Sequence, residues 1–104
     1  MKLTRFFPAS MWKPCRDNGN CYVASEALYH LLGGKAAGWT PMQMAMNGAN
    51  HWFLKHWSGL IIDATAAQFR GQRIPYHTAR GRGFLTKTPS RRARLLMRKL
   101  VFTD

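Results

Sequence analysis

Residues 20–34, NCYVASEALYHLLGG, set the first element of the fold and place a cysteine at its start. Apolar residues recur there at the spacing of one helix face: Ala24, Ala27, Leu28 and Leu31. Asn20 is a favourable N-cap residue, and Gly33-Gly34 supplies a stop. Because most other positions are also apolar, the segment predicts a central, buried helix from Cys21 to Leu32.

A small sheet is expected after this helix. Residues 51–56 (HWFLKH) and 60–63 (LIID) are predicted to form a hairpin around Trp57-Ser58-Gly59. Between the helix and the hairpin, Thr40-Pro41 favours a short helix over residues 42–46 that ends at the following Asn-Gly pair.

The C-terminal part predicts a second long helix, from Thr88-Pro89 to about Leu100. Its packing stripe consists of Ala93, Leu96, Met97 and Leu100. Arginines occupy the opposite face: Arg91, Arg94 and Arg98. We find no repeat and no linker, so residues 1–104 are expected to form one α+β domain.

Composition narrows the class of protein. The 104 residues include 16 Lys+Arg and 4 Asp+Glu, and 46% are hydrophobic. That apolar content argues against a disordered tail, and no apolar run approaches the roughly 18 residues of a membrane span. The prolines and lysine near the N-terminus interrupt a signal-peptide core. We expect a globular protein of the cytoplasm (the host cytoplasm if phage-encoded).

The formal net charge of +12 indicates attraction to an anionic partner, namely nucleic acid, a membrane surface or an acidic protein. The candidate anion-binding residues are Arg80, Arg82, Arg91, Arg94 and Arg98. The N-terminus of the helix that opens at Thr88-Pro89 also favours anions. No nucleic-acid motif accompanies these residues, so nucleic acid and an acidic protein both remain open as partners, and no membrane partner is expected.

Three residues could form a nucleophilic site. A thiolate at a helix start is stabilised by the positive end of the dipole, and Cys21 has that position. An imidazole can take the thiol proton, and a carboxylate can hold the imidazole in one tautomer. His51 and Asp63 follow in that order. Cys15 and Cys21 are too few for a cysteine zinc site, and no metal or cofactor is expected.

The hairpin geometry makes this proposal specific. A loop centred on Trp57 places His51 directly opposite Asp63, whereas a two-residue turn at Ser58-Gly59 sends Asp63 to the other face. The site therefore requires an odd-numbered loop or a bulge.

Each candidate also has a plainer structural interpretation. Cys21 suits a buried core position, and Asp63 suits capping of the segment that follows it. His56 is the alternative histidine, but its place near the hairpin tip favours His51. Cys15 is expected to be a passive neighbour of Cys21 or its partner in a regulatory disulfide.

Other polar and aromatic residues are assigned structural roles. Glu26 and His30 lie four residues apart on the first helix and are expected to form a surface pair. The core or the wall of a cleft is the expected place of three tryptophans, Trp39, Trp52 and Trp57. Trp52 is expected to shield the imidazole of His51 from water.

Three blocks resemble the core motifs of papain-like cysteine hydrolases: NCYVA at 20–24, NHWFL at 50–54 and GLIIDAT at 59–65. That group includes peptidases, transglutaminase-like enzymes and papain-fold toxin or effector domains. The Asp-Ala-Thr end of the last block, followed by Gln68-Phe69, is most similar to compact bacterial and phage versions. The resemblance covers residues 18–69, half of the chain.

The resemblance implies a papain-like core, with the Cys21 helix packed on a small antiparallel sheet. It implies Cys21 as nucleophile, His51 as general base and acid, and Asp63 as orienting residue. Many relatives carry an oxyanion-donating Gln about six residues before the nucleophile, where this chain has Cys15. The hole is then expected to use the Cys21 N–H with Asn18 or Asn20.

Two functions follow as expectations. One is a thiol hydrolase that acts on an amide of a protein or peptide substrate, by peptide or isopeptide cleavage or by glutamine deamidation or transfer. The other is a non-enzymatic basic binding protein of phage or mobile-element origin that contacts nucleic acid or an acidic host protein.

Overall fold

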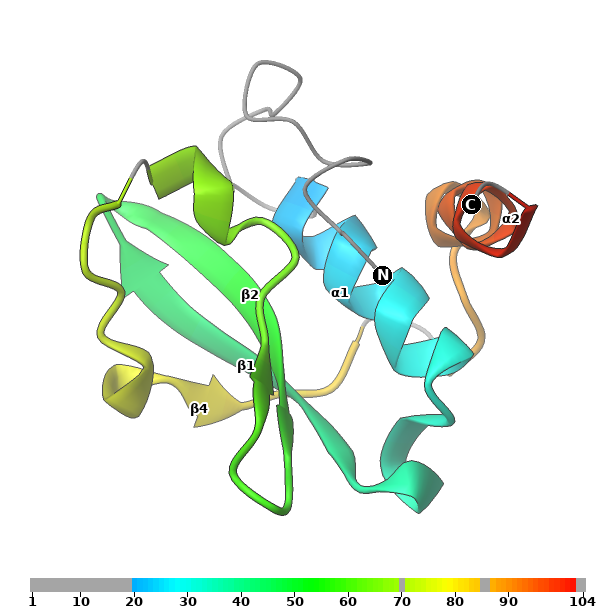
Figure 1. Cartoon of the computed structure of the whole chain (residues 1–104), viewed down its shortest axis with the longest axis horizontal. Coiled ribbons are helices and arrows are strands. Elements are labelled where there is room, and N and C mark those ends of the chain that lie inside the picture. The colour runs from blue at the N-terminus through cyan, green and yellow to red at the C-terminus, as the bar shows by residue number, and fades with distance from the viewer. Residues whose placement is uncertain (1–19, 70, 85–86, 103–104) are drawn as a thin grey trace.

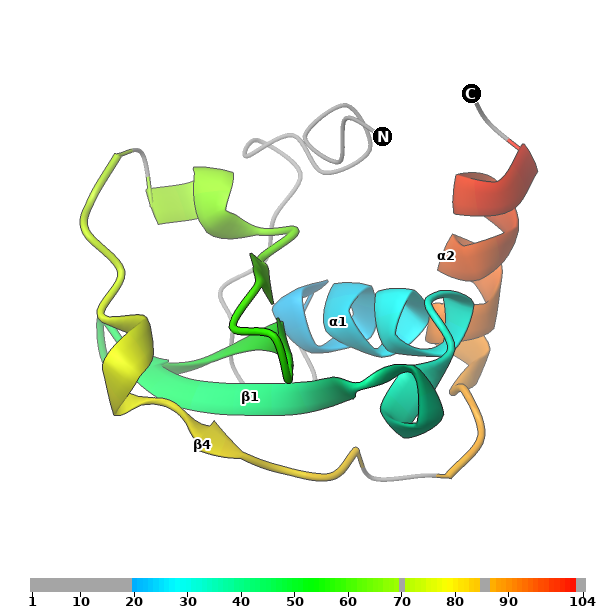
Figure 2. The ribbon, with the colours of Figure 1, turned by 60° about the horizontal axis from the view of Figure 1, so that its bottom comes forward.

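The computed structural model describes residues 20–69, 71–84 and 87–102. An antiparallel sheet has the strand order β3-β2-β1-β4, with β1 at Trp39–Met46, β2 at Ala49–His56, β3 at Ile61–Ile62 and β4 at Arg80–Gly81. Helix α1 (Asn20–Leu31) packs on this sheet, and α2 (Arg91–Phe102) packs on α1. Figures 1 and 2 show the order of these layers. The α+β class is therefore confirmed.

Helix α1 is the buried centre of the fold, as its sequence predicts. Every residue from Cys21 to Leu28 is buried. The helix ends where Gly33 takes φ 96°, a left-handed conformation that favours glycine. The buried position follows from a sequence that is apolar on nearly every side.

The sheet is covered on both faces. Trp52 and Leu54 of β2 pack in the clusters formed with α1. Phe53 lies in a separate cluster with Met44 and Met46 of β1, packed against partly buried side chains from the segment after β3: Phe69, Ile74, Tyr76 and Ala79. Successive residues of β2 therefore face different layers, as strand geometry requires.

The helix predicted over residues 42–46 is wrong, because this segment belongs to β1. β1 pairs with β2 along its full length, from Trp39↔His56 to Met46↔Ala49. Asn47 (φ 53°) and Gly48 (φ 78°) form the two-residue turn between them. Positive φ at both positions is typical of the type I′ turn, for which Asn-Gly is the strongest sequence signal. The Asn47-Gly48 dipeptide therefore connects the two strands of a hairpin and does not end a helix.

The second hairpin has the expected parity but a different centre. Leu54 pairs with Ile62, and Lys55 pairs with Ile61, so the three-residue loop is centred on Ser58 rather than Trp57. Continued past β3, this register places Thr65 opposite His51, and Asp63 is two residues away on the same face. The directly opposite pairing of His51 and Asp63 is therefore wrong, while their shared face holds.

Tryptophan burial differs from the expectation at one position. Trp39 and Trp52 are buried, whereas Trp57 at the hairpin tip is 81% exposed. Its backbone N–H bonds to the carbonyl oxygen of Gly38, and a Cβ on Gly38 would lie 2.0 Å from the indole. The close packing of Gly38 against one part of the indole leaves most of the ring in solvent.

Helix α2 packs through the predicted stripe. Ala93 is fully buried, and Leu96 and Met97 pack against the clusters of α1. Its exposed residues include all three predicted arginines: Arg91, Arg94 and Arg98. The helix begins at Arg91, after Ser90, whose Oγ accepts the N–H of Ala93 at 3.2 Å. Ser90 is thus the N-cap, which moves the start two residues past Pro89.

The expectation of a surface pair between Glu26 and His30 is wrong. Glu26 is fully buried, and its carboxylate accepts hydrogen bonds from the N–H and the Oγ–H of Ser90, both at 2.8 Å. A carboxylate is stabilised at a helix N-terminus by the dipole and by the cap N–H. The α2 N-terminus that was expected to favour an external anion therefore holds an internal one.

Among the described residues, no helix combines the length and the apolar character needed to cross a bilayer.

Candidate active site

The first turn of α1 brings Cys21 to the end of β2. Cys21 is the second residue of the helix and is 1% exposed. Its thiol donates a hydrogen bond to the carbonyl oxygen of Asn50 at 3.6 Å. Since that carbonyl carbon is bonded to the amide nitrogen of His51, the thiol is next to His51 along the strand. The predicted nucleophile and base are thus brought together.

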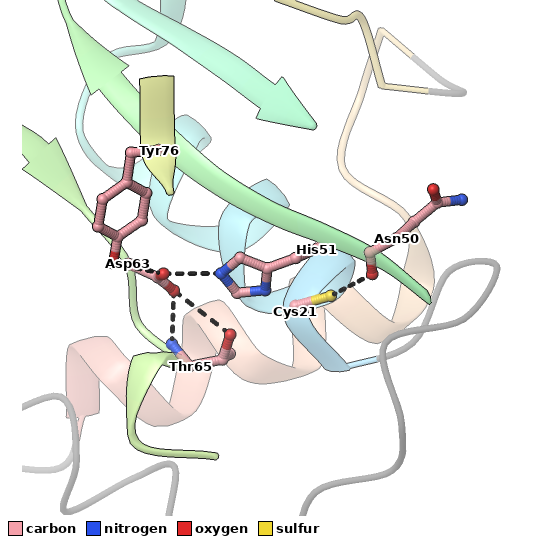
Figure 3. Close-up of polar contacts among 6 residues, drawn as sticks. All are labelled: Cys21, Asn50, His51, Asp63, Thr65 and Tyr76. Carbon is pink, nitrogen blue, oxygen red and sulfur yellow. Dashed lines mark hydrogen bonds and ion pairs between the residues drawn. The ribbon is translucent and has the colours of Figure 1, made fainter. Parts of the chain in front are cut away.

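The imidazole of His51 is enclosed and oriented. The residue is fully buried, and its Nε2 lies 2.7 Å from Oδ2 of Asp63. In the view of Figure 3 the ring lies between Asp63 and Cys21, with Nδ1 on the side of Cys21. A carboxylate at Nε2 favours a proton there, which leaves Nδ1 as the basic nitrogen of the neutral ring. This is the tautomer that a general base facing Cys21 requires.

The aromatic rings that contact His51 belong to the cluster formed by Phe53 and the segment after β3. Phe69 meets the imidazole edge to face at 4.9 Å, and Phe53 is stacked at 6.2 Å between centroids. Trp52 was expected to shield the imidazole, but its ring packs on Tyr22 and Phe84 instead. The shielding is therefore assigned to Phe69, which strengthens electrostatic interactions by excluding water.

Asp63 makes the contacts that both of its alternative roles, orienting His51 and capping the next segment, require. Its Oδ1 accepts the N–H of Thr65 at 3.2 Å and its hydroxyl at 3.4 Å, which is an Asx turn that starts the next segment. Its Oδ2 contacts His51 and also accepts the hydroxyl of Tyr76 at 2.9 Å. With the side chain 4% exposed, these four hydrogen bonds fix the carboxylate in place (Figure 3).

Tyr76 is a residue of the candidate site that the sequence did not indicate. It lies in a short 3-10 helix, Tyr76–Thr78. Burial raises the pKa of the Tyr76 phenol well above 10.0, and the charge and hydrogen bond of Asp63 raise it further. The phenol therefore stays protonated and donates to Asp63. No local sequence pattern indicates that Tyr76 donates a hydrogen bond to Asp63, 13 residues earlier in the chain.

The remaining candidates are placed as follows. His56 bonds to Ala37 O at 2.9 Å and to Ser58 Oγ at 2.8 Å, so it serves the hairpin and not Cys21. Asn18 and Cys15 lie outside the described residues, and so does the side chain of Asn20. The N–H groups at a helix start point outward and can stabilise an oxyanion. The first turn of α1 supplies such donors beside Cys21.

The five arginines are not brought together in one surface. Arg80 and Arg82 belong to β4 and the residues after it, at the edge of the sheet next to β1. Arg91, Arg94 and Arg98 are on α2, which packs on α1 (Figure 2). Within the described part of the chain, no three His, Cys, Asp or Glu side chains group to hold a metal ion.

Comparison of this chain with protein-family models, with curated proteins and with solved structures finds no match.

Proposed function

We propose that this protein is a thiol hydrolase of papain-like type that acts on an amide bond of a peptide or protein. The observation that carries the proposal is the buried His51–Asp63 pair, 2.7 Å between Nε2 and Oδ2, at the place where the first turn of α1 presents Cys21. A nucleophile at a helix start, a base beside it and an orienting carboxylate are the parts that acyl transfer needs.

In the acylation step, Sγ of Cys21 forms a bond to the substrate carbonyl carbon, and the thiol proton passes to Nδ1 of His51. Asp63 stabilises the imidazolium, and N–H groups at the start of α1 stabilise the oxyanion. The tetrahedral intermediate collapses as the C–N bond breaks and Nδ1 returns the proton to the leaving amine. A thioester on Cys21 remains.

In the deacylation step, His51 takes a proton from water while the water oxygen adds to the thioester carbonyl carbon. The C–S bond then breaks, the acid is released, and the proton returns to Sγ. An amine in place of water gives transfer, and ammonia as the leaving group gives glutamine deamidation.

Burial shapes the access of substrate. Cys21 and His51 are 1% and 0% exposed, and the thiol donates to Asn50. Acylation therefore requires local opening, so that the substrate carbonyl reaches the thiol and the thiol proton passes to Nδ1. A short, extended peptide segment suits such a site better than a large rigid substrate.

The test measures alkylation of Cys21 by iodoacetamide as a function of pH, in a Cys15→Ser chain so that the label has one target. Activation by His51 predicts labelling that persists well below pH 8.5, the rough value of an ordinary thiol. His51→Gln should move the profile toward that value. His56→Gln, at the other hairpin histidine, should leave it in place.

Turnover is then measured on a peptide library by mass spectrometry, with Cys21→Ala as the inactive control. The proposal would be overturned if Cys21 were labelled with the pH profile of an ordinary thiol both in the parent Cys15→Ser chain and in the His51→Gln chain. So would turnover that survives Cys21→Ala.

A further inference from the structure

An open hollow on another side of the molecule joins α1, β1 and the residues that follow β4. Its volume is about 560 Å³, within the range of small-ligand sites. None of Cys21, His51 or Asp63 lines it. Its nearest α1 residue, Tyr29, is eight residues after Cys21, roughly 12 Å along the helix. The hollow is thus separate from the candidate active site.

The lining combines cations with aromatic rings. Lys35, Arg82 and Lys87 supply the positive charges, and all three are exposed. The aromatic members are Tyr29, Trp39 and Phe84. No carboxylate lines the hollow. Glu26 and Asp63, the acidic residues of the described part of the chain, are hydrogen-bonded inside the fold. Within the described residues, therefore, no carboxylate is available to pair with these cations.

Two of the three cations are attached to fixed backbone. The N–H of Lys35 donates to the hydroxyl of Tyr29 at 3.0 Å, and the N–H of Arg82 donates to Pro41 O at 2.8 Å. Tyr29 and Pro41 are themselves part of the lining. The backbone from which the Lys35 and Arg82 side chains extend is thus positioned before any ligand arrives, which lowers the entropy cost of binding.

His30 adds an unsatisfied polar atom at the same place. It lines the hollow, and its Nε2 is buried without a hydrogen-bond partner in the described structure. Buried polar atoms are nearly always paired. The His30 ring therefore keeps a hydrogen-bonding atom that no described residue satisfies.

A second hollow of about 220 Å³ adjoins the first. It is lined by Arg80 and Arg82, so Arg82 belongs to both. Two cationic hollows that share a residue suit an extended polyanion better than an isolated anion. The net charge of +12 draws such a ligand to the protein from a distance.

We propose that these hollows bind single-stranded nucleic acid, with a base against the aromatic lining of the larger one and flanking phosphates on Lys35, Arg82, Lys87 and Arg80. Phosphate contacts supply most of the affinity, and base stacking on aromatic rings requires no particular sequence. This inference does not depend on the hydrolase proposal.

The experiment measures binding of fluorescein-labelled (dT)12 to the full chain by anisotropy, over a range of salt. Lys35→Ala/Arg82→Ala/Lys87→Ala should weaken binding at least tenfold and lower the slope of log K against log salt by about two. The matched control Arg91→Ala/Arg94→Ala/Arg98→Ala removes the same charge from α2 and should change affinity less than threefold. Thermal melting verifies that both variants fold.

Further arms separate the possible ligands. An abasic form of the oligonucleotide should bind at least fivefold more weakly, because it lacks the stacking base. Polyglutamate of equal charge should bind more weakly than (dT)12. Cys21→Ala should bind (dT)12 as the parent chain does, which keeps this test distinct from that of the hydrolase.

The following results would overturn the inference: no binding of (dT)12 at low salt, an equal loss in the α2 variant, or equal binding of the abasic strand or polyglutamate. Binding of dTMP as tight as that of (dT)12 would identify the ligand as a free nucleotide and overturn the single-strand assignment.

Discussion

The hydroxyl of Tyr76 and the ring nitrogen Nε2 of His51 hydrogen-bond the same atom, Oδ2 of Asp63, at 2.9 and 2.7 Å. One carboxylate oxygen thus joins the candidate base to a phenol that lies 25 residues further along the chain. Thr65 holds the other oxygen. The orientation of the His51 ring therefore depends on two side chains that act through Asp63.

Tyr76 is expected to act as a positioning residue. Tyr76→Phe removes the donor to Oδ2, so the carboxylate is less restrained and the imidazole is held less firmly. A net loss of about 1 kcal/mol corresponds to a roughly fivefold slower alkylation of Cys21 near neutral pH. Tyr29→Phe is the matched control, since its hydroxyl accepts the N–H of Lys35 away from the site. Equal rates in the Tyr76→Phe and Tyr29→Phe chains would contradict this role.

The same phenol predicts an alkaline loss of stability. Because burial and Asp63 raise the pKa of Tyr76 above 10.0 in the folded chain, the unfolded chain releases this proton first as pH rises. The contribution of Tyr76 is complete below pH 10 and declines above it, by up to about 1.4 kcal/mol per pH unit. Urea unfolding at pH 9 to 11 should show a shallower decline for Tyr76→Phe. Parallel declines in both chains would refute the assignment.

Glu26 and Ser90 are predicted to contribute to stability as one unit. Glu26→Ala removes the acceptor of two 2.8 Å hydrogen bonds and the anion at the start of α2, so we expect a loss of about 2–3 kcal/mol. Ser90→Ala should lose about 1 kcal/mol. Because the residues share a contact, urea unfolding of the double variant should show less than the sum. The exposed Arg98→Ala serves as control and should stay within about 0.5 kcal/mol. Additive losses would argue against the coupling.

The turn between β1 and β2 predicts a cost for any side chain at Gly48. Gly48→Ala meets no atom within 4 Å but must adopt φ 78°, so a loss of about 1 kcal/mol is expected from backbone strain alone. Gly83→Ala is the control, because it is equally open and has no positive φ. Thermal melting of the two variants measures the difference. If Gly48→Ala melts at the same temperature as Gly83→Ala, this turn is not type I′ in solution.

Local signals predicted several features correctly. The spacing of apolar residues predicted α1 and its burial, and that of α2 predicted Ala93, Leu96 and Met97 as its packing side. The parity argument for the β2–β3 loop predicted that His51 and Asp63 share a face. These properties depend on neighbours within a few residues, which a sequence displays directly.

Three features needed the folded chain. Residues 42–46 became a strand because pairing with β2 and β4 outweighed a weak helix signal, and Glu26 became buried because Ser90 arrives from 64 residues away. Tyr76 reached Asp63 across an irregular segment. The order of residues along the chain was enough to propose a thiol, an imidazole and a carboxylate. The partners of that carboxylate and the charge at the start of α2 were set by packing, since a hydrogen bond between distant segments leaves no periodic trace in either of them.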